Sequence, residues 1–300
     1  MILTYEWEGV FLRAYGLVDE TTGCIEAKPW EMGGTGLTMA RILANRRDDV
    51  HLLCALGPKR GKLMAERLNH EGLEVIALKT KEDNQETLLI EGQKTQRFST
   101  APPRMTQEEV RSFWNLFDEE LQRATVLLVP PHPVEMAKEA LEHGLDAAIP
   151  TVIAPGRRAK EFLESRPFCL VLRKEELEDV TGLKISFGHE VLRASRMVLQ
   201  KGVGRLVVLS RDGQAIMVQR EGAWRVKRES PTPLSIDTDA VALALAQAIL
   251  RQYDRDMTLS YALAAGIVGM ENLLREGDAS LKAQMQQLRG KELYDDTTSS

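Results

Sequence analysis

Two carboxylates and a hydroxyl stand at the start of the most apolar helix that the sequence predicts. Residues 233–250 are PLSIDTDAVALALAQAIL, so Asp237, Thr238 and Asp239 come directly before a run of Ala, Leu, Val and Ile. A helix that is apolar on every side is buried. Its N-terminus supplies free backbone N–H groups and the positive end of the helix dipole, a combination suited to anions. The turn is therefore either a site of phosphoryl transfer, with Asp239 as general base, or only a helix cap.

Three glycines precede the first helix that the sequence predicts. The stretch MGGTG places Gly33, Gly34 and Gly36 directly before LTMARILANRR, which carries an apolar stripe. Glycines at such a place either form the hinge below a lid that closes over a ligand, or make only a tight turn. The residue types leave both interpretations open.

Composition and charge narrow the classes of function. The chain of 300 residues is 43% apolar and 28% charged, which is ordinary for a globular protein. Its formal net charge of −5 argues against nucleic acid as a partner. The five histidines show no metal-ligand spacing. Cys24, Cys54 and Cys169 stand alone, as in a reducing cytosol, so we expect a cytoplasmic protein. We expect no membrane span and no signal peptide.

Apolar strands and amphipathic helices alternate along most of the chain. Buried strands such as ATVLLVP and FCLVL are separated by helices such as VEMAKEALEHG, a pattern that predicts a mostly parallel sheet covered on both faces. Segments near 8–14, 24–32 and 86–99 alternate in polarity and favour a smaller, half-exposed sheet. We therefore expect one three-layer α/β domain over residues 1–290, carrying a small β lid, and a disordered tail over residues 291–300.

Local signals predict several individual helices. Thr106, with Glu109 three residues later, forms a capping box that predicts a helix over residues 106–122. We also expect helices over RRAKEFLES (157–165) and over residues 278–288.

The order of these motifs resembles the ribokinase family, in its phosphofructokinase-B branch, over nearly the whole chain. MGGTGLTMARILANR is similar to the family's GGKGINVARVL, and LRKEELEDVTG is similar to its K-P-N-x-x-E-L segment. LVVLSRDGQAIMV resembles the strand and hairpin before the nucleotide site, and SIDTDAVALALAQAI falls on the VGAGD turn and its helix. The resemblance is strongest to kinases of phosphorylated sugars such as fructose 1-phosphate and tagatose 6-phosphate.

This resemblance implies a ribokinase-like fold, ATP and magnesium as cofactors, a sugar or sugar phosphate as acceptor, and a homodimer formed through the lid. The positions that it matches are Gly33, Gly34 and Gly36 at the lid hinge and substrate side, Glu176 and Gly213 on the nucleotide and magnesium side, and Asp239 as catalytic base. Asp237, which departs from the pattern, is a further candidate on the nucleotide and magnesium side. Glu176 also fits the solvated face of an acidic helix, and Asp237 also fits an N-terminal cap.

Several polar positions depart from the family pattern. The three residues before Asp239 are Ile236, Asp237 and Thr238 instead of Gly-Ala-Gly, and a nest of N–H groups needs conformations that glycine reaches easily. Asp237 also brings negative charge toward a polyphosphate. Three single residues also differ: Thr35 stands for the phosphate-binding lysine, Thr38 for an asparagine, and Arg173 for the asparagine before Glu176. Three longer motifs differ as well. EWEGVF replaces L-N-P-A-x-D, VPPHPVE replaces SGSLPxG, and VIAPG replaces LDTSG.

These departures affect both the sugar side and the nucleotide side. They favour a kinase homologue that has lost most or all phosphoryl transfer and acts by binding a ligand or a protein partner. The alternative is an active, divergent ATP-dependent kinase of a sugar or sugar phosphate, with Asp239 as its base. Arg173 and Lys174 either contact an anionic ligand or partner, or are only surface charge. The sequence specifies neither the sugar, the phosphate donor, the partner nor the oligomeric state.

Overall fold

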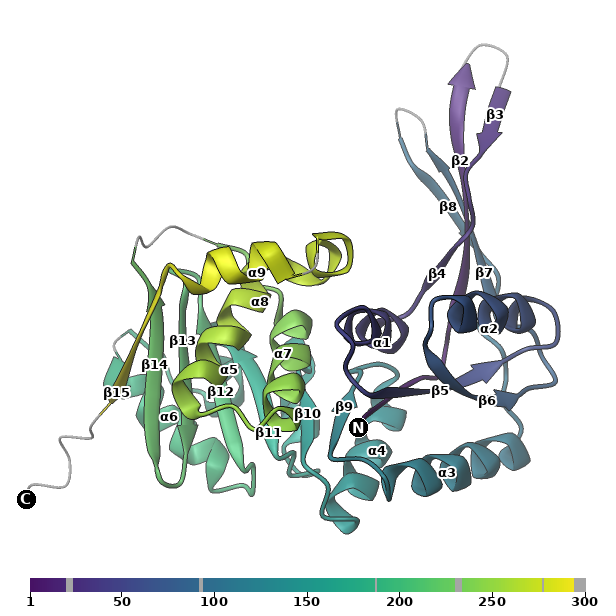
Figure 1. The fold of residues 1–300 in the computed structure, drawn as a ribbon. Coiled ribbons are helices and arrows are strands. Elements are labelled where there is room, and N and C mark those ends of the chain that lie inside the picture. The colour runs from purple at the N-terminus through teal and green to yellow at the C-terminus, as the bar shows by residue number, and fades with distance from the viewer. Residues whose placement is uncertain (20–23, 92–93, 187, 230–233, 277, 294–300) are drawn as a thin grey trace, which may run out of the picture. The chain divides into compact units, whose positions relative to one another are not determined.

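The chain folds into two compact units, which the computed structural model describes except for residues 20–23, 92–93, 187, 230–233, 277 and 294–300 (Figure 1). Unit 1 comprises Met1–Leu3, Ile42–Asp49 and Leu121–Ser300. Unit 2 comprises Thr4–Arg41 and Val50–Glu120. The first strand, β1 (Ile2–Glu6), contributes residues to both. The expectation of a single domain over residues 1–290 stays a prediction.

Unit 1 is built on a large, mostly parallel sheet with the strand order β15-β14-β13-β12-β11-β10-β9-β1. The strands from β9 to β12 and the start of β1 pair in parallel, whereas β13, β14 and β15 pair antiparallel. The central strands are apolar and buried on both faces, as their continuous apolar runs predict. The bounds are β9 (Val126–Val129), β10 (Thr151–Ile153), β11 (Cys169–Arg173), β12 (Arg205–Ser210), β13 (Gln214–Gln219), β14 (Gly222–Arg228) and β15 (Leu288–Leu293).

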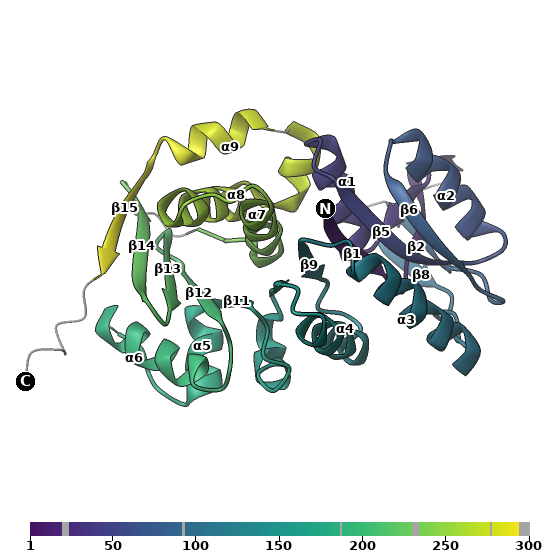
Figure 2. The same cartoon turned by 60° about the horizontal axis from the view of Figure 1, so that its bottom comes forward.

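Helices cover both faces of the unit 1 sheet, so the prediction of a three-layer α/β fold is confirmed (Figure 2). One face carries α4, α5 and α6, and the other carries α7, α8 and α9 (Figure 2). The bounds are α4 (Val134–Asp146), α5 (Lys174–Thr181), α6 (Gly188–Leu199), α7 (Thr238–Leu250), α8 (Arg255–Glu276) and α9 (Asp278–Met285).

The most apolar helix, α7, is buried as its composition predicts. Every residue from Ala240 to Ala248 is buried, and the helix contacts β9, β10, β11 and α8. Gln247 is the polar member of this stretch, and its Oε1 accepts a hydrogen bond from the Tyr261 hydroxyl at 2.9 Å. The core of unit 1 therefore surrounds the helix that begins at the candidate site.

The long helix α8 corrects the expectation that no segment is apolar enough to span a membrane. By length and composition alone, residues 255–276 meet that criterion. In the fold, 56% of the apolar window is buried inside the protein, and α8 packs on α7, β13 and β14. Packing in the core of unit 1 accounts for the hydropathy of this helix.

Unit 2 combines strands of parallel sheet with a second, smaller sheet. β5 (Val50–Leu56) pairs in parallel with β6 (Glu74–Lys79) and follows β1 in the strand order. The smaller sheet has the order β3-β2-β7-β8, with β4 paired to β2, so the prediction of a second sheet is confirmed. The remaining bounds are β2 (Val10–Asp19), β3 (Cys24–Ala27), β4 (Glu31–Gly33), β7 (Gln85–Glu91), β8 (Gln96–Ser99), α1 (Thr35–Asn45), α2 (Arg60–His70) and α3 (Gln107–Leu121).

The capping box before α3 is confirmed. The Glu109 backbone N–H donates to Thr106 Oγ1 at 3.2 Å, and the Thr106 backbone N–H donates to Glu109 Oε2 at 2.7 Å. Both partners lie within one helical turn, which explains why a local sequence pattern suffices to find this helix.

Two expected elements differ from the observed ones. Where an α-helix was expected over residues 157–165, the chain forms the short 3₁₀-helix η1 (Gly156–Phe162). The Arg158 N–H donates to the Pro155 carbonyl at 3.3 Å, an i→i+3 bond. Residues 288–293 form β15, because they pair with β14 in a register that local sequence does not encode. The strand includes residues 291–293, which were expected in the tail, and the rest of the tail lies outside the described residues.

Gly266 lets α8 approach the start of α7, and its replacement tests this packing. A Cβ at this position would lie 2.5 Å from Val241 Cγ2 and 2.7 Å from Ile236 Cγ2. We expect Gly266→Ala to lower the free energy of unfolding by about 1–3 kcal/mol, because the two helices have to move apart. The measurement is urea unfolding. Gly188→Ala is the control, since a Cβ there would meet no atom within 4 Å, and equal stability of the two variants would contradict the close approach.

Candidate functional site

Asp237 is the N-cap of α7, as the cap interpretation predicts. Its Oδ1 accepts hydrogen bonds from the backbone N–H groups of Asp239 at 3.0 Å and Ala240 at 3.2 Å. These are the donors that the first turn of a helix leaves without an intrahelical partner. The carboxylate of the chain itself therefore occupies the N–H groups that suit an anion.

A third donor reaches Asp237 from α8. Gly269 has φ +78° and ψ 157°, so it interrupts α8, and the N–H of Met270 donates to Asp237 Oδ2 at 2.9 Å. The Asp237 N–H in turn donates to the Gly266 carbonyl at 2.9 Å. One side chain thus joins the start of α7 to the kink of α8.

Asp239 follows in the first turn of α7 and has a perturbed acidity. The pKa of its carboxyl is raised from 3.8 to about 6, first by burial and then by the negative charge of Asp237, while the Arg173 guanidinium opposes both effects. A carboxyl with this pKa is a usable general base near neutral pH. The same value follows for a carboxyl that is simply crowded by a second acid, so the pKa by itself assigns no role.

Glu176 is turned toward Arg173 at the end of β11. Its Oε2 accepts the Arg173 backbone N–H at 2.8 Å, and its Oε1 lies 3.5 Å from Arg173 Nη1. The Glu176 side chain is 5% exposed, so the solvated-face interpretation of this residue is wrong. Arg173 Nη2 also donates to the Ile236 carbonyl at 3.2 Å, which ties the end of β11 to the turn before α7.

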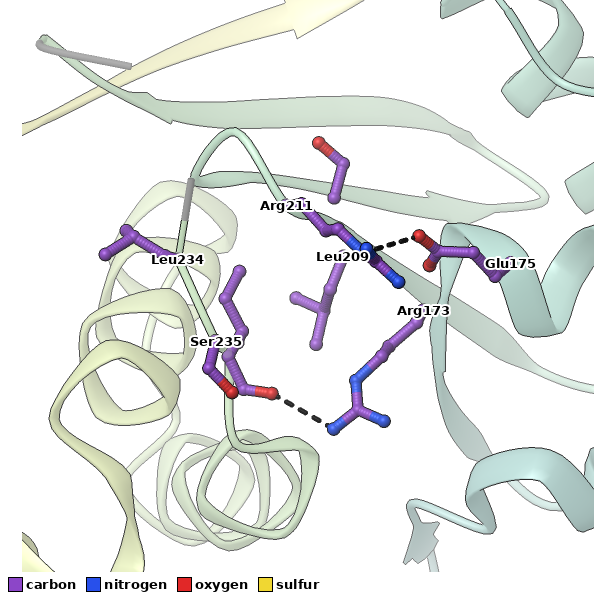
Figure 3. A pocket seen from close by; sticks show the side chains of 8 residues that line it. Arg173, Glu175, Leu209, Arg211, Leu234 and Ser235 are labelled. Atoms are coloured by element: carbon purple, nitrogen blue, oxygen red, sulfur yellow. Dashed lines mark hydrogen bonds and ion pairs between the residues drawn. The ribbon is translucent and has the colours of Figure 1, made fainter. Parts of the chain in front are cut away.

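A cavity of about 520 Å³ lies beside this turn (Figure 3). Arg173 enters it from β11, and Arg211 enters from the connection between β12 and β13 (Figure 3). Arg211 Nε lies 2.8 Å from Glu175 Oε1, and both side chains of this pair are exposed. The volume falls within the range of small-molecule sites.

Gly213 has a structural role in the turn between β12 and β13. Its φ of +77° is one that residues with a side chain rarely adopt, and its N–H donates to the Ser210 carbonyl at 3.1 Å. It is not among the residues that line the cavity beside it. The positive φ of this turn is therefore a structural reason for the glycine that matches the family's nucleotide-side pattern.

In unit 2, Gly34 and Gly36, at the start of α1, lie against the carboxylate of Glu6. Glu6 Oε2 accepts the N–H groups of Gly36 at 3.0 Å and Leu37 at 3.3 Å. Gly34 has φ +141°, and a Cβ there would lie 2.3 Å from the same oxygen. Gly33 ends β4, where it pairs with Val10 of β2. Close approach of Glu6 is thus a physical reason for glycine at position 34.

Glu6 is strongly affected by this environment. It is 7% exposed, and burial raises the pKa of its carboxyl from 4.5 to about 7, while the N–H groups of Leu37, Glu8 and Gly36 act in the opposite direction. The helix start of unit 2 is therefore filled by an internal carboxylate, as is the helix start of unit 1.

The residues singled out by the sequence form two groups, one in each unit. Asp237, Asp239 and Glu176 lie around Arg173 in unit 1. Gly34 and Gly36 lie around Glu6 in unit 2, while Gly33 faces Leu12 and Val10 of β2, and the sequence analysis did not identify Glu6 individually. The available signal was an acidic residue in EWEGVF, at the end of a buried strand, where the family pattern has L-N-P-A-x-D.

The start of α7 offers no unoccupied anion site for the phosphates of the ATP that the resemblance implies. Within the part of the chain that the structure describes, no three His, Cys, Asp or Glu side chains are grouped so as to hold a metal ion, but kinase magnesium is held by one or two carboxylates together with the substrate phosphates, so the individual acids decide the fit. Glu176 is engaged by Arg173, and both carboxylate oxygens of Asp237 already accept backbone hydrogen bonds. A phosphate at the start of α7 would have to displace that carboxylate.

Several solved structures share this fold over nearly the whole chain. A Staphylococcus aureus protein assigned as a phosphofructokinase superposes with a TM-score of 0.83 at 16% identity, covering 99% of this chain and 100% of that chain. Escherichia coli phosphofructokinase-2, in complex with substrates and products, gives 0.72 at 16% identity, with 95% and 99% covered. A Thermotoga maritima protein assigned as a 1-phosphofructokinase gives 0.72 at 13% identity, with 98% and 100% covered. At these identities the likeness is one of fold.

Sequence comparison supplies the family. No curated protein matches the chain. The model of the pfkB family of carbohydrate kinases matches residues 29–274, which is more than half of the chain and includes the start of α1 and the turn before α7. The chain therefore belongs to the pfkB family of carbohydrate kinases.

Proposed function

We propose that this chain is a pfkB-family homologue that has lost phosphoryl transfer and acts by binding a ligand or a protein partner. The observation that carries the proposal is the Asp237 carboxylate, which accepts three backbone N–H groups at 2.9–3.2 Å. Catalytic anion sites keep such donors free for the charge that develops in the transition state.

The loss of rate expected when these donors are engaged supports an inactive site. Removing one oxyanion donor typically costs about 10²–10³ in rate, and here three donors are engaged by one side chain. A phosphate that entered would also meet the negative charge of Asp237. Displacing the carboxylate would remove the cap of α7, which typically costs about 0.5–2 kcal/mol.

The acceptor side supports the same conclusion independently. The family resemblance assigns the glycines before α1 to the sugar, and Glu6 occupies the N–H groups of Gly36 and Leu37. A buried carboxylate at this place repels a sugar phosphate when it is ionised and leaves those two donors filled in either state.

A second candidate is an active ATP-dependent kinase of a sugar or sugar phosphate, with Asp239 as general base. The observation that favours it is the pKa of about 6 for Asp239 at the start of a helix, where a base can accept the proton of an acceptor hydroxyl. This candidate requires Asp237 to leave the start of α7 when the phosphate donor binds.

A turnover assay distinguishes the two candidates. Purified protein is given ATP and magnesium with fructose 6-phosphate, fructose 1-phosphate or tagatose 6-phosphate, and ADP release is measured. We expect no turnover above background, because the donors that would hold the transferring phosphate are filled. Turnover in the wild type that falls by about 10²-fold or more in Asp239→Asn would establish the second candidate. Asp146→Asn, at the exposed end of α4, is the matched control.

The pH dependence of stability tests whether Glu6 is held as the structure describes. Because the folded-state pKa of Glu6 is raised, the folded protein keeps its proton between about pH 4.5 and 7 and the unfolded chain does not. The protonated Glu6 carboxyl therefore stabilises the folded state fully below about pH 4.5, and this stabilisation is lost as the pH rises through about 7. Urea unfolding should therefore show the wild type losing on the order of 3 kcal/mol relative to Glu6→Gln between pH 5 and 8.

The exposed carboxylate of Glu31, in the same unit, provides the control for this measurement. Glu31→Gln should follow the wild-type pH profile. Parallel profiles for the wild type and Glu6→Gln would contradict a buried Glu6 carboxyl.

We further propose that the chain forms a homodimer through the smaller sheet of unit 2. Support comes from edge strand β8, which is exposed along its length and carries Phe98 with 54% exposure. Escherichia coli phosphofructokinase-2 has been solved in a tetrameric inhibited form.

Sedimentation should give a dimer for the wild type and a monomer for Phe98→Asp. The control is Leu145→Asp, at an exposed position of α4, which should stay dimeric. A wild-type monomer at micromolar concentration would overturn the proposal.

A further inference from the structure

A further cavity of unit 1 lies at the edge of the sheet opposite to the start of α7. Its walls include Thr151, the first residue of β10, and Phe168 and Gly204, which directly precede β11 and β12. Arg173 ends β11, so the five residues of that strand separate this amino-edge cavity from the candidate site by about 16 Å. Ligands of open α/β sheets bind at the carboxyl ends of the strands, so the amino-edge cavity is a separate place for a ligand.

The walls of the amino-edge cavity are mostly apolar. Its volume is about 310 Å³, near the lower end of the range of roughly 300–1,000 Å³ for small-molecule sites. Leu145 and Phe168 contribute large side chains that are 48% and 38% exposed, and Ile149 and Pro150 add further apolar surface. Exposed apolar side chains gathered around one hollow indicate a binding surface, whereas isolated ones need no explanation.

Two glycines let side chains of this cavity lie directly against backbone. Gly202 has φ +103°, and a Cβ there would lie 2.9 Å from both Cγ and Cδ of Arg166. A Cβ on Gly204 would lie 2.9 Å from the Phe168 carbonyl oxygen and 3.4 Å from Cδ2 of its ring. The Arg205 guanidinium, 5.4 Å from the centroid of the same ring, holds Phe168 by a cation–π contact. The positions of the ring and of the arginine stem are therefore set in the free protein.

Arg166 supplies positive charge to the lining. Its side chain is exposed, and no residue in the described part of the chain forms an ion pair with it. The two arginines of the cavity beside α7 differ in this respect, because Arg211 and Arg173 lie 2.8 and 3.5 Å from glutamate oxygens. At the amino edge, the guanidinium is available to a carboxylate that a ligand brings.

We propose that the amino-edge cavity binds a small aromatic monocarboxylate. The ring of the ligand packs against Leu145, Ile149 and Phe168, and its carboxylate accepts paired N–H bonds from Arg166. A flat ring fits a wall that combines the Phe168 ring with the bare backbone of Gly204. One guanidinium matches one negative charge, whereas a polyphosphate would place unmatched charge against apolar walls. The proposal goes beyond the proposed function and holds whether or not the start of α7 transfers phosphate.

Calorimetric titration of the full chain tests this ligand class. The probes are benzoate, phenylacetate and indole-3-acetate, each beside its own neutral amide, with acetate to measure the charge alone. We expect at least one aromatic acid to bind with a Kd below about 1 mM, and about fivefold or more tightly than its amide and than acetate. Amides that bind as tightly as their acids would overturn the role of the carboxylate. Absence of binding by all three acids would overturn the site.

Two variants connect the result to the residues. Arg166→Gln removes the charge and should lower the affinity for the acid to that for its amide, while the amide binds as before. Phe168→Ala removes the ring and should weaken acid and amide alike, by about fivefold or more. Arg211→Gln is the matched control, since it removes an exposed arginine from the cavity beside α7, and it should change neither affinity. Thermal unfolding of each variant checks that it is folded.

The outcomes also locate the bound acid and separate it from the proposed function. Loss of acid binding in Arg211→Gln, with wild-type affinity in Arg166→Gln, would place the acid beside α7 and overturn the proposal. Turnover in the kinase assay would overturn the proposed function without affecting the binding of an aromatic acid at the amino edge.

Discussion

The start of a buried helix must have its backbone N–H groups satisfied without help from bulk water, and this requirement governs the candidate site. In α7 the solution is Asp237, which accepts from Asp239 and Ala240 and takes a third bond from Met270. Because α7 lies in the core of unit 1 and α8 packs along it, the same carboxylate also holds the two helices in register. Any ligand at this place competes with an interaction on which the core depends.

Unit 2 meets the same requirement in the same way, with a different electrostatic result. Glu6 accepts from Gly36 and Leu37 at the start of α1, but its burial is deeper and dominates over the hydrogen bonds that favour the charged form. Two helix starts of one chain are thus satisfied by internal carboxylates. A helix start whose N–H groups need a ligand becomes more ordered when the ligand binds. The N–H groups named here at the starts of α7 and α1 already have carboxylate partners in the free protein.

What the sequence could predict follows the range of the interactions involved. The capping box of α3 and the burial of α7 depend on neighbours within a turn or on composition, and both are predicted correctly. Glu6 meets α1 across about thirty residues, and EWE alone does not tell which carboxylate points inward. The same holds for β15, whose pairing with β14 joins distant segments. It holds also for η1, a seven-residue 3₁₀-helix in the connection between β10 and β11.

The substitutions in unit 1 compensate one another, and this bears on what the site does. Asp237 adds negative charge and raises the pKa of Asp239, while Arg173 lowers that pKa, pairs with Glu176 and donates to the Ile236 carbonyl. Loss of a function without replacement would leave buried polar groups without partners, which is costly. Here the residues that depart from the kinase pattern satisfy each other and leave a cavity beside them. Such mutual satisfaction keeps the turn before α7 folded without a ligand, because each buried polar group there already has a partner.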